Sequence, residues 1–216
     1  MRRGHAPDES AAISPSFDPV SLPILGEPLP VELANTWYSD DGTMIDFLAT
    51  SELIVAWFAH APAASGHVLP TPVTSKVITS LRELRDATYA LCAHVTLDSR
   101  ATPTAPVAAL NQLAGRAPGQ LRLRWDDTAP PISTLLHTGP PANVLLARLA
   151  SEAIAFFASA DRALLRRCAT PVCELFFVQR HHRRRFCSEP CSQRTRQSRY
   201  YRNHHPSSTH PSAAGR

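Results

Sequence analysis

Four of the five cysteines fall within 24 residues, and their spacing is typical of a metal site. Cys168 and Cys173 are separated by four residues, Cys187 and Cys191 by three, and 13 residues lie between the two pairs. Each short spacing lets the backbone bend round one edge of an ion, and the insert brings the second pair back to the opposite edge. Four thiolates complete the tetrahedral shell of Zn²⁺ and leave no position for water. The pattern therefore predicts a structural zinc site and not a hydrolytic one.

Two other interpretations of these residues stay open. The four cysteines could form two disulfides, which a secreted chain would favour. The first residues, however, include two acids and no apolar stretch, so they do not resemble a signal peptide, and we expect a cytoplasmic protein with reduced thiols. Alternatively, His181 or His182 could replace one cysteine as ligand, although both fall at the tip of the expected hairpin, away from the cysteine pairs.

The charge of the chain is divided between its two ends. Residues 166–216 contain 11 arginines and two acids, which gives +9, whereas the first 165 residues carry −5. A cationic end on an acidic body indicates a polyanionic partner. Arginine suits phosphate oxygens and guanine edges, so we expect this cationic segment to lodge against a nucleic-acid duplex. The residues expected at this contact are Arg183, Arg184 and Arg185 on a hairpin and Arg194, Arg196, Arg199 and Arg202 on a helix. The alternative partner is an acidic protein surface.

The elements that position these residues follow from hydrophobic periodicity. We expect a leader (1–24) and a tail (203–216) to be disordered, and between them an α+β body (residues 25–165) and a small zinc-bound finger (166–202), which is a β-hairpin followed by a helix. The body is predicted to be helix-rich with a small antiparallel sheet. Its predicted strands are 29–37, 121–125 and 132–137, and its predicted helices begin near residues 50, 75, 107 and 143 and end near residues 59, 96, 113 and 166. In the finger, we expect 175–178 and 184–186 to pair across a turn at 180–183, and Ser188 to cap the helix.

The body offers one candidate polar site and no catalytic set. Asn35 would be an amide on an otherwise apolar strand face that ends at Trp37, so it is either a structural clasp or part of an effector pocket with Trp37. The fifth cysteine, Cys92, has the spacing of a core residue in a helix. We find no nucleophile elbow, phosphate-binding glycine loop or paired carboxylates, so we do not expect an enzyme. No apolar run approaches the roughly 18 residues of a membrane span, and no membrane association is expected.

The sequence also resembles a known family. CATPVCELFFVQRHHRRRFCSEPCSQR is similar to the CGNR zinc finger, which is named for a Cys-Gly-Asn-Arg motif at its last cysteine. GEPLPVELANTW, DFLATSELIVAW and LRELRDA resemble segments of the ABATE domain that precedes this finger, so the likeness covers about residues 25–202. It implies a stress-linked bacterial transcription regulator, with DNA binding by the finger and effector sensing by the body. The chain departs from the motif after Cys191, where it has Ser192-Gln193-Arg194 in place of Gly-Asn-Arg.

Overall fold

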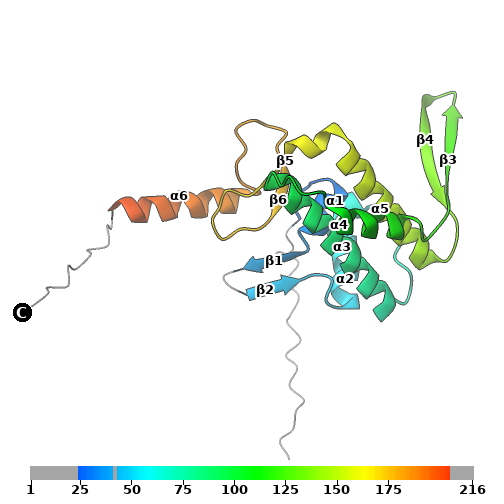
Figure 1. Cartoon of the computed structure of the whole chain (residues 1–216), viewed down its shortest axis with the longest axis horizontal. Helices are drawn as coiled ribbons and strands as arrows, with labels where there is room; N and C mark the ends of the chain where they lie inside the picture. The colour runs from blue at the N-terminus through cyan, green and yellow to red at the C-terminus, as the bar shows by residue number, and fades with distance from the viewer. Residues whose placement is uncertain (1–23, 41–42, 205–216) are drawn as a thin grey trace, which may run out of the picture.

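The computed structural model describes residues 24–40 and 43–204, and it has the predicted α+β class. The body contains five α-helices, and a sixth belongs to the finger; all strands of the described part pair antiparallel in two-stranded sheets (Figure 1). The helices are α1 (Leu29–Ala34), α2 (Ser51–His60), α3 (Ser75–Thr96), α4 (Thr104–Ala114), α5 (Pro141–Ala158) and α6 (Glu189–His204), with short 3₁₀ turns η2 (Pro62–Ala64) and η3 (Ala160–Leu164). The strands are β1 (Trp37–Asp40), β2 (Thr43–Asp46), β3 (Gly119–Asp126), β4 (Ala129–His137), β5 (Leu165–Arg167) and β6 (Phe176–Val178).

Capping side chains fix where two of the predicted helices begin. The Thr50 hydroxyl accepts a hydrogen bond from the Leu53 amide at 3.3 Å, and the Thr74 hydroxyl accepts one from the Val77 amide at 3.4 Å. Each bond satisfies one of the free amides in the first turn of α2 or α3. The helix predicted at 75–96 is confirmed at both ends, and that predicted near 50–59 is confirmed to within a residue.

The main core lies where α3 packs against α1, α4 and α5. Leu81 and Leu84 of α3, Leu146 of α5, and Ile54 and Trp57 of α2 are almost fully buried there. Helix α5 is also long and apolar enough, by length and composition alone, to cross a membrane, which the search for apolar runs overlooked. In the structure it contributes seven buried side chains to the helical body, as a core helix does.

The strand predicted at 29–37 is wrong over most of its length. Residues Leu29–Ala34 form α1, and only Trp37 enters strand β1. All six residues of α1 are buried, so the apolar positions carry no helical stripe. Pro30 lies within the first two positions of α1, where proline favours the start of a helix. This signal was outweighed by the alternation of apolar residues that indicated a strand.

The helix predicted to run from Asn143 to about Arg166 is also corrected. It begins at Pro141 and ends at Ala158, after which η3 and β5 occupy the remaining segment. Leu164, expected in its buried stripe, is 37% exposed. Strand β6 pairs with β5 and not with residues 184–186, so the hairpin predicted within the finger is wrong. The sheet is formed instead by β5, which precedes Cys168, and β6, which follows Cys173.

The strands predicted at 121–125 and 132–137 are confirmed, but as an isolated hairpin. β3 and β4 pair antiparallel, with one register shift between Arg124 and Asp126, and stand out from the helical body on the side away from α6 (Figure 1). All of β3, and all of β4 except His137, is exposed. The predicted leader and tail lie outside the described residues, except that Ile24 is described and α6 extends to His204.

Candidate metal centre

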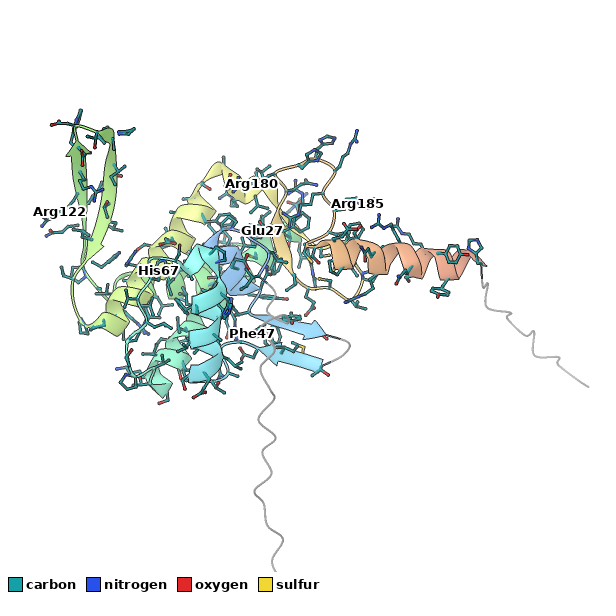
Figure 2. All side chains as sticks on the ribbon, turned by 180° about the vertical axis from the view of Figure 1, so that it is seen from behind. Glu27, Phe47, His67, Arg122, Arg180 and Arg185 are labelled. Carbon is teal, nitrogen blue, oxygen red and sulfur yellow. The ribbon has the colours of Figure 1, made fainter. Side chains whose placement is uncertain are left out.

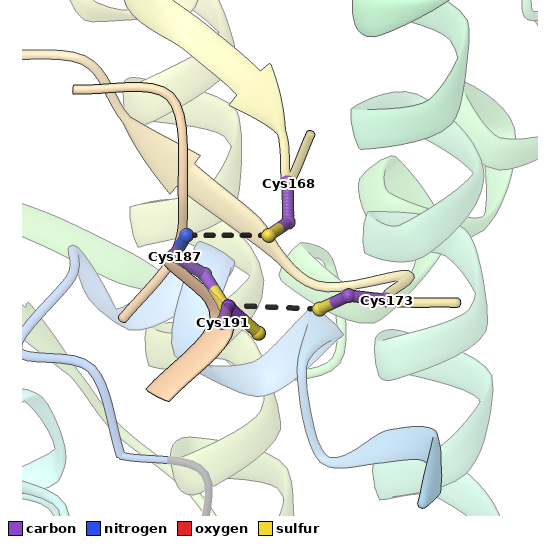
Figure 3. Close-up of side chains that lie close together, drawn as sticks. All are labelled: Cys168, Cys173, Cys187 and Cys191. Atoms are coloured by element: carbon purple, nitrogen blue, oxygen red, sulfur yellow. Dashed lines mark hydrogen bonds between the residues drawn. The ribbon is translucent and has the colours of Figure 1, made fainter. Parts of the chain in front are cut away.

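The fold brings the four predicted cysteines together in one cluster (Figure 3). Cys168 follows β5, Cys173 lies in the turn that leads to β6, Cys187 precedes α6, and Cys191 lies in its first turn. Their Sγ atoms all lie within 4.8 Å of one another. Cys168, Cys187 and Cys191 are buried, and Leu175 and Phe177 pack against them.

The sulfur separations fit a tetrahedral thiolate site. The Sγ atoms of Cys173 and Cys187 lie 3.7 Å apart, and those of Cys187 and Cys191 lie 3.6 Å apart. A tetrahedron with metal–sulfur bonds of about 2.3 Å has edges of about 3.8 Å. A disulfide has a sulfur–sulfur distance of about 2.05 Å, so these distances fit thiolates round an ion and not a covalent bond. All four cysteines are free thiols.

Backbone hydrogen bonds hold the two cysteine pairs in place. The Cys168 amide donates to the Leu175 carbonyl at 2.9 Å, and the Cys187 amide points at the Cys168 sulfur at 3.4 Å. Thr170, in the turn between the first two cysteines, is buried, and its hydroxyl donates to the Cys191 carbonyl at 3.1 Å. The first turn of α6 is therefore attached to the loop of the first pair by side-chain contacts as well as by sulfur.

The thiols also perturb one another electrostatically. Hydrogen bonds from the thiols of Cys173 and Cys187 lower the pKa of Cys168, so negative charge collects first on this sulfur. Because the thiols of Cys173 and Cys187 hydrogen-bond to the Cys168 sulfur, the pKa of Cys173 is raised to about 12 and that of Cys187 is also raised, and the three thiols do not ionise readily together. A bound cation removes this conflict by stabilising all the thiolates together. The donor set therefore suits a divalent metal.

A buried amide attaches the finger to the body. The Asn35 side chain accepts a hydrogen bond from the Phe176 amide at 2.9 Å and donates to the Phe176 carbonyl at 3.0 Å. Asn35 caps the C-terminus of α1 and is 1% exposed. Of the two roles left open for this amide, the structure shows the clasp. Asn35 extends the short sheet of the finger by pairing with the free edge of β6.

A buried carboxylate makes a second attachment (Figure 2). Glu27 accepts a hydrogen bond from the Val178 amide at 2.9 Å and pairs with the Arg184 guanidinium at 2.6 Å. Arg184 also stacks 4.5 Å above the Phe177 ring and donates to the Cys187 carbonyl at 2.8 Å. Arg184, expected at the DNA contact, therefore has its guanidinium bound within the protein, where it connects the body to the metal loop.

Comparison with known families agrees with this arrangement. Residues 27–160 match the ABATE family, described as a "putative stress-induced transcription regulator", and residues 164–204 match the CGNR zinc finger. The chain belongs to the ABATE family. No curated relative matches it. The ABATE match covers the helical body together with the projecting hairpin, and the CGNR match covers β5, β6, all four cysteines and α6.

The altered CGNR motif lies in the first turns of α6. The Ser192 amide bonds to the Ser188 carbonyl at 3.2 Å as in a regular helix. The Gln193 side chain donates to Glu189 at 3.4 Å, and Arg194 is exposed. In this ABATE protein the two substituted positions are thus accommodated within the helix, and the retained arginine remains at the surface.

The other predicted arginines divide between two hollows on the finger. Arg183 and Arg185 line one of about 370 Å³ beside the start of α6, together with Ser188 and Ser192. Arg194 and Arg199 line another of about 320 Å³ between α6 and the loop of the first cysteine pair. Within the described residues, none of these four arginines forms an ion pair.

The last two expected contacts are placed differently. Arg196 pairs with Glu189 on the exposed face of α6 at 2.6 Å. Arg202 belongs to α6, but its side chain lies outside the described part of the structure.

The structure separates the two residues of the predicted effector pocket. Trp37 is 39% exposed and lines a hollow of about 400 Å³ with Arg85, Asp86 and Tyr89. Asn35 does not line this hollow. Both polar atoms of its amide bind Phe176 on the finger.

Sequence reasoning missed Glu27 and Thr170 altogether. Both are polar residues that the fold buries, at 5% and 3% exposure, Glu27 between body and finger and Thr170 between the first cysteine pair and α6. An acid and a threonine in loop segments carry no signal of burial, and only the long-range contact with the finger reveals their roles.

Proposed function

We propose that the four cysteines hold Zn²⁺ and that the chain is a transcription regulator whose finger binds double-stranded DNA. The observation that supports this proposal best is a set of four exposed arginines, Arg183, Arg185, Arg194 and Arg199, which form no ion pair within the described part of the chain, on a finger that the metal would make rigid. The family description supports the regulatory role. A shell of four thiolates leaves no open coordination position, so we propose no catalytic role for the metal. The place of action is the cytoplasm, at the nucleoid.

The arginines are arranged for phosphate contacts. Arg183 and Arg185 lie at the start of α6, where the helix dipole favours anions, and the one carboxylate of this hollow, Glu189, is paired with Arg196. Arg194 and Arg199 of α6 line a hollow whose remaining lining is uncharged, with hydroxyls from Thr195 and Ser198 and an apolar side chain from Val172. A phosphate backbone that follows the finger from one hollow to the other would meet arginines in both.

Salt dependence of DNA binding tests the proposal. Each phosphate neutralised by an arginine contributes about 0.9 to the slope of log K against log salt concentration. The zinc-loaded full chain should bind fluorescent genomic duplex fragments with a slope of about 3 to 4 if the four arginines each engage one phosphate. The double variant Arg194→Gln/Arg199→Gln should lower that slope by about 2, measured by fluorescence anisotropy.

A matched control separates contact from net charge. Arg167→Gln/Arg180→Gln removes the same charge from the same finger, but these arginines pair with Glu174 at 2.9 Å and Asp161 at 3.3 Å. The control should leave the slope within about 0.5 of the wild type. Equal slopes for both double variants, or binding without salt dependence in the intact chain, would contradict the proposal.

A second proposal concerns the body, where we place effector binding in the hollow beside Trp37. This hollow offers two aromatic rings, Trp37 and Tyr89, with the Arg85 guanidinium and the Asp86 carboxylate beside them. A planar molecule with a polar edge suits this lining. Such a ligand should raise the melting temperature of the wild type and not that of Trp37→Ala. A ligand that stabilises both equally would place effector binding elsewhere.

A further inference from the structure

The projecting hairpin has one face composed almost entirely of apolar side chains. Leu121 lies opposite Leu135, and Leu123 lies opposite Ser133. Trp125 lies at a register shift and has no paired partner, but the two-residue period of β3 puts it on the same face as these leucines. Leu121 is 74% exposed, Leu123 68%, Trp125 72% and Leu135 41%. We call this set the leucine face. It carries no acid and no arginine.

The opposite face has a different composition. Gln120, Arg122 and Arg124 of β3 point to it, and Thr134 of β4 lies opposite Arg122. Two apolar side chains of β4 lie among these polar groups, Ile132 and Leu136. The hairpin is therefore amphipathic, yet neither face is covered by the rest of the chain in the described structure.

Such a hairpin requires a partner surface. A two-stranded sheet alone in water is marginally stable, and a continuous apolar patch on a protein surface usually marks an interaction site. The helical core does not supply this cover, because β3 is exposed at every position and extends away from the helices (Figures 1 and 2).

We infer that the leucine face is a dimer interface, on which the same face of a second copy packs. Two leucine faces are complementary, since each presents alternating leucines and a tryptophan and neither requires a charge to leave water. Packing face to face also leaves Arg122 and Arg124 of both copies in solvent. If the β3 strands of two copies paired edge to edge instead, Arg122 and Arg124 of the two copies would lie side by side and the leucines would remain exposed to water.

The area available sets the strength of this dimer. Eight residues of β3 extend about 26 Å, and two strands span about 10 Å in width. Two such faces with protruding leucine and tryptophan side chains bury on the order of 1,000 Å² in total, which is at the lower limit of specific interfaces. We therefore expect a reversible dimer with a dissociation constant on the order of micromolar.

The tip of the hairpin argues against a lipid or nucleic-acid partner. Asp126 and Asp127 lie at the turn, and Asp126 accepts hydrogen bonds from the amide and hydroxyl of Thr128 at 3.0 and 2.8 Å. These bonds hold a carboxylate at the point that would first meet an anionic membrane or a phosphate backbone. A neutral protein surface is the better match, and a second copy provides one.

Sedimentation velocity on the zinc-loaded full chain tests the inference. From about 1 µM to about 200 µM the wild type should pass from monomer to dimer. Leu121→Glu/Leu123→Glu should remain monomeric throughout, because dimerisation would bury four carboxylates. The matched control Gln120→Glu/Thr134→Glu adds the same charge to the same hairpin on its other face and should dimerise within about threefold of the wild type.

Hydrogen exchange of residues 119–137 provides a second readout that does not depend on how well a variant folds. In the wild type, exchange should slow as concentration rises, because dimerisation stabilises the hairpin. Protection that is already complete at the lowest concentration would show that the chain's own segments cover the face and would overturn the inference. So would a monomeric wild type at the highest concentration, or loss of the dimer in both double variants.

Discussion

The clasp between Asn35 and β6 gives the sharpest test of how the finger is held. Asn35→Ala removes the acceptor of the Phe176 amide and the donor to the Phe176 carbonyl, at 2.9 and 3.0 Å, from a position that is 1% exposed. A buried polar group left without a partner costs about 1–3 kcal/mol. With two such groups, and with partial relief by entering water, we expect the free energy of unfolding to fall by about 3–4 kcal/mol.

Urea unfolding of the zinc-loaded protein, followed by tryptophan fluorescence, measures this change through the shift in midpoint. Asn111→Ala is the matched control, since Asn111 is an exposed asparagine in α4 and its replacement should change stability by no more than about 0.5 kcal/mol. A loss below about 1 kcal/mol in Asn35→Ala would refute the reasoning, because it would mean that Phe176 finds other partners or that the clasp does not hold the finger.

Three further predictions follow from the same junction. Cys187→Ser should reduce the zinc content from about one ion per chain to well below one, measured by metal analysis, and should make the finger more sensitive to limited proteolysis. Cys92→Ser, which changes a cysteine outside the cluster, should retain the metal. Burial raises the pKa of Glu32 to about 7, so the folded protein holds this proton more tightly than the unfolded chain does. The stability that this proton contributes is present below about pH 4.5 and is lost as pH rises through 7. Relative to Glu32→Gln, the free energy of unfolding of the wild type should therefore fall by up to about 3 kcal/mol between pH 5 and pH 8. Urea midpoints that change with pH in the same way for both proteins would contradict this. Chelation of the metal should make the Cys92 thiol react with an alkylating reagent in native buffer, although Cys92 is not in the cluster, because Phe176 and Val178 of the finger pack with it.

The sequence was informative where the signal is local. α3 was predicted at its correct ends because its apolar residues recur at helical spacing. The cysteine cluster was predictable because four ligands of one chemistry at short spacings leave few other arrangements. The isolated strands β3 and β4 were also predictable, since leucine and arginine alternate along β3 with the period of a strand.

The parts that were not predictable depend on contacts between distant segments. α1 is buried on all sides, so its composition does not show the period of a helix. β5 was assigned to a helix because nothing in three residues reveals that β6 will pair with them. Arg184 looks like its neighbours in the sequence, and only the position of Glu27 distinguishes it from an arginine that faces solvent.

The body and the finger are best understood as one folding unit with two kinds of cross-link. Phe176 and Val178 of β6 share a buried cluster with Val31 of α1 and Cys92 of α3, while the sulfur cluster lies just beyond Phe177 on the other side of the same strand. A segment of three residues thus presents one face to the apolar core and the other to the cysteine cluster. A metal bound by the four cysteines would order β6, and ordered β6 covers the body, so part of the free energy of binding the ion would stabilise the helices. The finger of this ABATE protein therefore cannot move freely relative to its body without exposing Val31 and Cys92 to water.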